Sequence, residues 1–332
     1  WERWRKRKYR NTWSIFMKRQ EEQGFTKSEV ITGKHKVVAY QKHPFDKTVQ
    51  NRTVLCLNGG PGLPCDYLRD SHAMLCDHGY HVVSYDQLGT GQSDNPDDPS
   101  LWTIERYTQE VEAVRDALGL GKVHLLGHSW GGWLAIEYAI TYPENIHSLI
   151  LQGTAADIPL LLSEMERLRN ALGSETSAMM RRYEAEKDWN NPEYMAAITL
   201  LNHRHVCRLP QIPPAYQRSK DGLNSAIYNH MQGPNEFHYI GNLRNWSRTT
   251  ELMQLKVPAL VTAGQFDEIT PACARQIGEC LNGAEVRIFP NSSHHPHFEE
   301  PDAFFPVLID FLNRTTADLD SGTLQNFVED TE

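Results

Sequence analysis

The sequence predicts an α/β fold with a mostly parallel central sheet, helices on both faces and an inserted helical cap. Short apolar runs alternate with segments of helical periodicity, which is typical of parallel strands joined by crossover helices. That alternation stops between residues 154 and 250, where the chain is polar and helical and is interrupted by prolines. The 332 residues are enough to bury a sizeable core.

The first predicted elements form a hairpin followed by strand and helix repeats. Residues 25–41 contain two strands joined at Thr32-Gly33, a hairpin signal. Residues 53–60 are a short apolar run that ends in glycines, as expected of a buried strand that meets a loop. Residues 81–94 repeat this form, and residues 103–120 have helical periodicity up to a glycine.

The second half of the predicted sheet continues the same alternation. Residues 122–143 combine a strand, a tight turn and a helix, and residues 146–153 form the next strand. Two more strands are predicted at residues 257–264 and 284–291, with a helix over 270–281 between them. Because parallel strands need a crossover connection, these segments belong to one sheet with helices on its faces.

These patterns divide the chain into a core, a cap and two terminal segments. We assign residues 25–153 and 251–314 to the core and residues 154–250 to the cap. Residues 315–332 are acidic and small, which predicts a mobile tail. Residues 1–24 are basic and form either a surface helix that touches acidic lipid or a partner, or a solvated tail.

Bulk composition excludes several classes of protein. The net charge of −9 argues against a nucleic-acid partner. No apolar run approaches the roughly 20 residues that span a bilayer, and no secretory signal precedes the core, so we expect no transmembrane segment. The six cysteines have no C-x-x-C spacing, which favours a reducing compartment and a cytoplasmic location. No pattern predicts an oligomeric state.

Residues 127–131, "GHSWG", fit the pattern G-x-S-x-G at a junction between a strand and a helix. In that context the turn forces Ser129 into a strained conformation and projects its side chain out of the sheet. Gly127 and Gly131 lack Cβ atoms, so strand and helix can approach closely. We therefore predict that Ser129 is a nucleophile, against the alternative of a glycine-rich turn with an incidental serine.

Residues 58–62, "NGGPG", follow the first core strand, where α/β-hydrolases supply a donor for an oxyanion hole. The predicted donors are the backbone N–H groups of Gly60 and Trp130. Pro61 fixes the turn and Gly62 relieves crowding. The alternative is an ordinary Gly-Pro loop.

A serine nucleophile needs a base, usually a histidine held by a carboxylate. Asp267 lies at the end of a strand, at the edge of the sheet where such sites form, and Glu268 beside it is an alternative acid. The base must come from the next strand end, where His294, His295 and His297 fall within four positions.

Those three histidines could also supply three nitrogen ligands to zinc. Adjacent residues rarely converge on one ion, however, and no H-E-x-x-H spacing accompanies them. A metal would also leave Ser129 without a role. We therefore predict one base with two neighbours, and neither a metal nor another cofactor.

Five motifs occur in this order: "NGGPG", "YDQLGTGQSD", "GHSWGG", "GQFDEITP" and "SSHHPHFEEP". With them, residues 25–314 resemble the proline iminopeptidases, α/β-hydrolase serine aminopeptidases that include the tricorn-interacting aminopeptidase. The resemblance extends into the insertion through "NPEY", "HRH" and "MQGPNEF". G-x-S-x-G alone would name only the superfamily, whereas "GGPG" with "GPNEF" and "FDE" is more specific.

The resemblance implies roles for individual residues. Ser129 is the nucleophile, Asp267 the acid and His294 the base. Glu236, in "GPNEF", and Glu268 hold the free amino group of the substrate. Carboxylates suit this role, because a buried ammonium group needs compensating charge and carboxylates accept strong hydrogen bonds from it. Gly59 is assigned to substrate binding together with these glutamates.

The chain departs from the family pattern at several positions. Asn58 replaces a histidine, Leu88 replaces an arginine, and His295 and His297 stand where apolar residues are common, which puts the proline preference in doubt. Candidate contacts for a proline ring, each equally consistent with plain core packing, are Trp130, Trp133, Tyr194 and Trp246.

The function expected is a serine aminopeptidase that removes an N-terminal residue, with proline expected, from small peptides or amino-acid amides. One alternative keeps the triad but hydrolyses an ester, a lactone or an amino-acid amide. Another is a non-catalytic α/β-hydrolase that only binds its ligand. An epoxide hydrolase or a dehalogenase would need Asp in place of Ser129.

Overall fold

A computed structural model describes residues 20–22, 24–44 and 51–321. Within them, nine strands form one sheet in the order β1-β2-β3-β5-β4-β6-β7-β8-β9. The pairs among β1, β2, β3 and β5 are antiparallel, and the other pairs are parallel. The strands are β1(Gln20–Glu22), β2(Phe25–Thr32), β3(His35–Lys42), β4(Thr53–Leu57), β5(His81–Asp86), β6(Val123–His128), β7(Ile146–Gln152), β8(Ala259–Gly264) and β9(Glu285–Phe289).

Helices cover both faces of this sheet, as the alternation of elements predicts. Along β4, Leu55 and Leu57 pack into one apolar cluster, whereas Val54 and Cys56 pack into the other, because successive side chains of a strand point to opposite faces. The helices of the core are α2(Asp66–His72), α3(Ile104–Ala117), α4(Trp130–Thr141), α11(Pro271–Cys280), α12(Pro296–Glu299) and α13(Pro301–Asp320).

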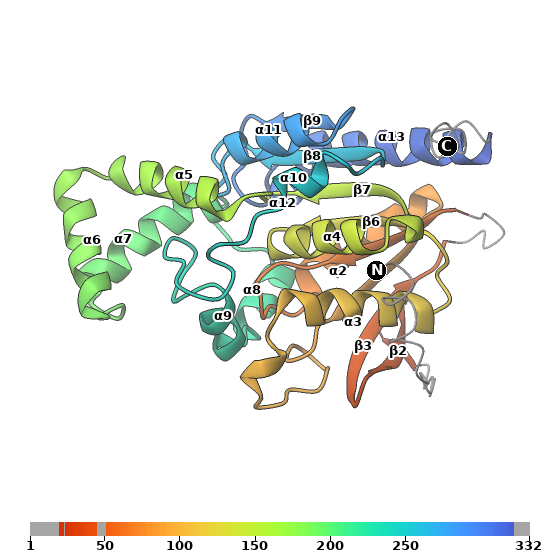
Figure 1. The fold of residues 1–332 in the computed structure, drawn as a ribbon, viewed down its shortest axis with the longest axis horizontal. Coiled ribbons are helices and arrows are strands. Elements are labelled where there is room, and N and C mark those ends of the chain that lie inside the picture. Colours follow the sequence, from red (N-terminus) through yellow and green to blue (C-terminus); the bar gives the residue numbers. More distant parts are fainter. Residues whose placement is uncertain (1–19, 23, 45–50, 322–332) are drawn as a thin grey trace.

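The segment between β7 and β8 is helical and extends away from the sheet, with α6 and α7 farthest from it in Figure 1. Helix α8 returns to the core and packs on α2, where Tyr67 N–H donates to Ser219 Oγ at 3.1 Å. The helices of this segment are α5(Ile158–Asn170), α6(Ser174–Glu186), α7(Pro192–Leu201), the π-helical turn η4(Asn202–Val206), α8(Pro214–Asp221), α9(Ser225–Met231) and α10(Thr249–Leu252).

Both predicted terminal boundaries need correction. Helix α13 continues to Asp320, so the tail does not begin at residue 315. Thr315 and Thr316 are buried, and their hydroxyls donate to main-chain oxygens one turn earlier, which lets two β-branched polar residues continue the helix. At the other end, residues 20–22 form β1 rather than part of a basic tail. The rest of the two predicted terminal segments, residues 1–19 and 322–332, lies outside the described residues.

The order of the parallel strands determines which loops meet. The loops after β4, β6, β7, β8 and β9 all leave the carboxyl edge of the sheet, where ligands bind in open α/β sheets. The predicted site residues of the core follow β4, β6, β8 and β9. Across the described part of the chain, no helix combines the length and apolar character needed to cross a bilayer.

Candidate active site

Ser129 occupies a sharp turn between β6 and α4. Its backbone has φ 57° and ψ −124°, a region that costs a residue with a side chain about 1–3 kcal/mol. The turn is possible because glycines flank it: a Cβ on Gly127 would lie 2.2 Å from Gly131 O, and one on Gly131 would lie 2.0 Å from Leu57 O. The Ser129 N–H donates to Gln152 O at 2.9 Å, which anchors the turn to β7.

Asp267 and His294 form a buried pair from the loops after β8 and β9. His294 Nδ1–H donates to Asp267 Oδ1 at 2.8 Å, and the Ile269 N–H donates to the same oxygen at 2.9 Å. Burial alone lowers the pKa of His294, but the charge and hydrogen bond of Asp267 and the charge of Glu236 outweigh it, so the pKa lies above the ordinary 6.5. Because Nδ1 carries the bonded proton, Nε2 of neutral His294 is free to accept one.

In the described residues, the Ser129 hydroxyl and the His294 ring are not hydrogen-bonded to each other. Among the hydrogen bonds of residues 24–44 and 51–321, none joins Ser129 Oγ to His294 Nε2. Instead, His294 Nε2 lies 3.7 Å from Glu268 Oε1. Catalytic hydrogen bonds often form fully only when substrate binds, so the lack of a Ser129–His294 hydrogen bond here is compatible with the two residues acting together.

Two backbone N–H groups near Ser129 are available to a ligand. Within the described ranges, neither the Gly60 N–H nor the Trp130 N–H donates to a protein acceptor. Gly60 has φ 120°, and a Cβ there would lie 2.7 Å from Gly62 N, so only glycine fits. By contrast, the Gly59 N–H is occupied by Tyr67 Oη at 2.7 Å. Gly59 therefore has no free N–H group, and a Cβ on it would lie 3.0 Å from Ser129 Cβ.

A buried chain of hydrogen bonds, which the sequence motifs did not reveal, joins these loops. His128 Nε2–H donates to His294 O at 2.9 Å, because a carbonyl can only accept. His128 Nδ1 therefore accepts from the Tyr67 hydroxyl at 2.7 Å, and that hydroxyl accepts from the Gly59 N–H. His128 thus connects the loop of Gly59, the turn of Ser129 and the loop of His294.

Glu236 and Glu268 place two carboxyl groups next to His294. Burial, with the charges of Glu236 and Asp267, raises the pKa of Glu268 well above its ordinary value. Burial also raises the pKa of Glu236, whose Oε2 accepts from Gln232 Nε2 at 2.7 Å. In the described part of the molecule, no Lys or Arg pairs with either group, and Glu268 Oε2 has no hydrogen-bond partner. The pair is therefore suited to receive a cation.

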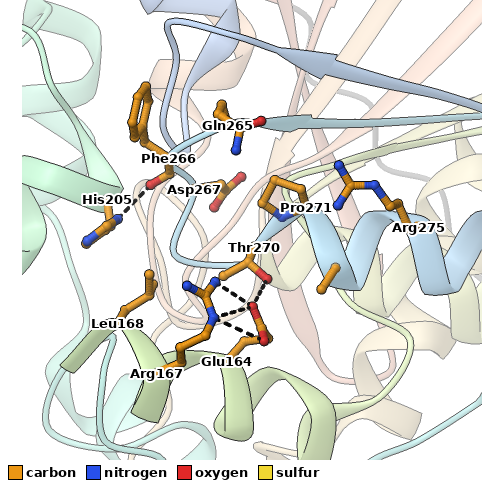
Figure 2. Close-up of a pocket in the computed structure, with 11 residues that line it drawn as sticks. Glu164, Arg167, Leu168, His205, Gln265, Phe266, Asp267, Thr270, Pro271 and Arg275 are labelled. Atoms are coloured by element: carbon orange, nitrogen blue, oxygen red, sulfur yellow. Dashed lines mark hydrogen bonds and ion pairs between the residues drawn. The ribbon is translucent and has the colours of Figure 1, made fainter. Parts of the chain in front are cut away.

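A pocket of about 300 Å³ lies beside the loop of Asp267, on the side of α5 (Figure 2). Figure 2 shows Glu164 bonded to both Arg167 and Thr270 at one wall of this pocket. On the other side, His205 in η4 donates through Nδ1 to Phe266 O at 2.8 Å. The Glu268 N–H also donates to His205 O at 3.1 Å. The helical insertion therefore holds both ends of the segment that carries Asp267 and Glu268.

The remaining histidines of the cluster pack against His128. His295 and His297 are buried and pack against His128, with ring centroids 5.0 Å and 5.3 Å from its ring. In the described residues they meet His128 as a group that could hold a metal ion, and His294 is not part of that group. The group therefore contains His128 in place of His294, the third histidine of the zinc alternative that the sequence offers.

The four candidate contacts for a proline ring are all buried. Trp130 Nε1–H donates to Gln87 Oε1 at 2.9 Å, and Trp246 Nε1–H donates to Glu137 Oε1 at 2.6 Å. The Tyr194 hydroxyl donates to Glu184 Oε1 at 3.0 Å. Trp133 packs against Tyr239 and Trp246 with centroid distances of 6.2 Å and 6.3 Å. Trp130, Trp133 and Trp246 therefore form one aromatic cluster, whereas Tyr194 lies in α7 of the insertion.

Known proteins resemble this chain in sequence. A family model described as the alpha/beta hydrolase fold matches residues 52–301. A proline iminopeptidase of Saccharolobus solfataricus is 38% identical over 266 residues, which are 80% of this chain and 86% of that protein.

Two solved structures agree closely with this one. The crystal structure of a proline iminopeptidase from Mycobacterium smegmatis has a TM-score of 0.82 at 32% identity and covers 88% of this chain and 99% of its own. The crystal structure of VinJ has a TM-score of 0.82 at 33% identity, with 87% and 98% covered. The chain therefore belongs to the proline iminopeptidase family of α/β-hydrolase fold proteins.

Proposed function

We propose that this protein is a serine aminopeptidase that hydrolyses the amide bond after an N-terminal residue, with proline expected, of short peptides or amino-acid amides. The observation that carries this proposal is the pair of buried carboxyl groups, Glu236 and Glu268, beside His294. Two such groups without a cationic side chain as partner are costly to bury, and a substrate ammonium would supply the missing charge.

In the proposed mechanism Ser129 Oγ attacks the carbonyl carbon of the first residue. His294 Nε2 takes the hydroxyl proton, and Asp267 holds the imidazole through Nδ1. The N–H groups of Gly60 and Trp130 stabilise the oxyanion. His294 then gives the proton to the leaving amine, and water hydrolyses the acyl-enzyme by the same route.

The two glutamates would make the enzyme an exopeptidase. They accept charge-assisted hydrogen bonds from the free amino group, which an internal peptide bond or an acetylated residue lacks. The insertion between β7 and β8 lies over the same edge of the sheet and would restrict access to short chains. We also propose a cytoplasmic location, because all six cysteines are free thiols.

The test compares three substrates: a Pro-arylamide, its N-acetyl derivative and a simple acyl ester. The proposal predicts that the Pro-arylamide has a much higher kcat/KM than the acetylated compound. Cleavage of the ester alone would assign the same residues to an esterase or a lactonase.

A fluorophosphonate probe separates the enzyme from a protein that only binds its ligand. The proposal predicts covalent labelling of the wild type and none of Ser129→Ala. A wild type that is not labelled, although it is folded by circular dichroism, would support the non-catalytic alternative.

A further inference from the structure

Three buried histidines outside the proposed catalytic set converge behind the turn of Ser129. His128 is the last residue of β6, and His295 and His297 lie at the start of α12. One ring nitrogen from each lies within 4.8 Å of the others. The rings of His295 and His297 are 5.3 Å apart, similar to their distances from His128.

Two of these side chains lack hydrogen bonds. In the described part of the chain, neither ring nitrogen of His295 and neither of His297 has a protein partner, and each residue is only 2% exposed. Buried polar groups are almost always bonded, and an unbonded one costs about 1–3 kcal/mol. Their neighbours include the aromatic rings of Tyr216 and Phe298, whose faces accept only weak hydrogen bonds. The ring nitrogens of this cluster are therefore available to a ligand.

His128 is already oriented as metal-binding histidines are. Its Nε2–H donates to the main-chain oxygen of His294, so the lone pair of the neutral ring is on Nδ1. Histidines that bind metals almost always direct the other N–H to a carbonyl or a carboxylate in this way. This hydrogen bond fixes both the ring orientation and the tautomer.

We propose that His128, His295 and His297 bind a divalent transition-metal ion, with Zn²⁺ as the ion that fits best. Three neutral imidazoles suit Zn²⁺, whereas Mg²⁺ and Ca²⁺ require oxygen ligands. Tetrahedral Zn–N bonds of about 2.0–2.1 Å place the nitrogens about 3.3 Å apart, so the side chains need to close by roughly 1.5 Å. The Tyr67 hydroxyl, 2.7 Å from His128 Nδ1, would have to move from that nitrogen when an ion binds.

Metal binding would act on the proposed active site. An ion on His128 Nδ1 displaces the hydrogen bond from Tyr67, whose hydroxyl also holds the Gly59 N–H next to Gly60. The expected consequence is inhibition, because Gly60 is a proposed oxyanion donor. This inference goes beyond the proposed hydrolase, and metal binding is measured without reference to activity.

The test uses the full chain, stripped of metal by a chelator and dialysed against Zn²⁺. We expect the wild type and His230→Gln, a control at an exposed histidine, to bind one ion per chain. His295→Gln and His297→Gln should bind it at least about 100-fold more weakly, because loss of a direct ligand costs more than loss of an outer-shell partner. Because two separate variants are compared, and circular dichroism checks the fold of each, misfolding of one leaves the test intact.

Cobalt and turnover give two further readouts. Co²⁺ should give the wild type the intense visible absorption of a four-coordinate site, and His295→Gln should lack it. Zn²⁺ should inhibit arylamide hydrolysis by the wild type and by His230→Gln at the concentration that fills the site. Absence of stoichiometric binding to the wild type, or site variants that bind Zn²⁺ as tightly as the wild type does, would overturn the proposal. Binding without inhibition would overturn the link through Tyr67.

Discussion

The change Glu268→Gln tests recognition of the substrate amine most sharply. The variant keeps the size of the side chain and removes a carboxyl group that can become negatively charged, 3.7 Å from His294 Nε2. A hydrogen bond to a charged group contributes about 1.5–3 kcal/mol. Since about 1.4 kcal/mol is a factor of ten, kcat/KM for a Pro-arylamide should fall about 10- to 150-fold. Most of the loss should be in KM, because the ammonium is held in both the ground state and the transition state.

The assay measures kcat/KM for a Pro-arylamide and for a simple acyl ester without an amino group. The ester should be hydrolysed by Glu268→Gln within about threefold of the wild type, because it makes no contact that depends on this charge. Glu251→Gln, at an exposed position, is the matched control and should change neither substrate. Equal losses on both substrates would mean that Glu268 supports His294 rather than the amine, and no loss on either would refute the reasoning.

Three further results are expected. Because His294 must be neutral to act as a base and its pKa is raised, kcat should fall as the pH drops through a value above 6.5. Glu236→Gln removes a charge that raises the pKa of His294, so it should move this fall in kcat to lower pH. An unchanged pH profile would contradict the effect of Glu236 on His294. Tyr67→Phe should lower the free energy of unfolding in urea by about 1–3 kcal/mol for each buried group that it leaves unbonded. The control Tyr183→Phe removes an exposed hydrogen bond to Glu193 and should change the free energy of unfolding by less than about 0.5 kcal/mol. Glu268→Gln should raise Tm at neutral pH, because a carboxyl whose pKa is raised by folding destabilises the fold at every pH above its ordinary pKa, and glutamine does not titrate. An unchanged Tm would mean that folding does not raise the pKa of Glu268.

The sequence was sufficient for the sheet and for the residues at its edge. Strands β4, β6, β7, β8 and β9 are short apolar runs, and a polar or glycine-rich motif follows each predicted site strand. Since parallel strands end at one edge, chain order alone brings the loops of Ser129, Asp267 and His294 together. The His294–Asp267 hydrogen bond at 2.8 Å joins the two predicted partners.

The contacts between loops could not be predicted in the same way. Tyr67 lies on α2 in no recognised motif, and its hydrogen bond to His128 depends on how α2 packs under α8. The G-x-S-x-G pattern assigns no role to His128, although a second histidine at the end of a buried strand was a usable signal. The end of α13 was missed because the composition after residue 315 is polar, and burial of Thr316 decides the helix there.

The most direct test of Ser129 as the nucleophile of an aminopeptidase is arylamine release from a Pro-arylamide by the wild type and by Ser129→Ala. We expect turnover by the wild type and a fall in kcat of about 10⁴- to 10⁶-fold in the variant, with both proteins folded by circular dichroism. A variant that keeps more than about a tenth of the wild-type rate, or a folded wild type that releases no arylamine, would contradict this expectation.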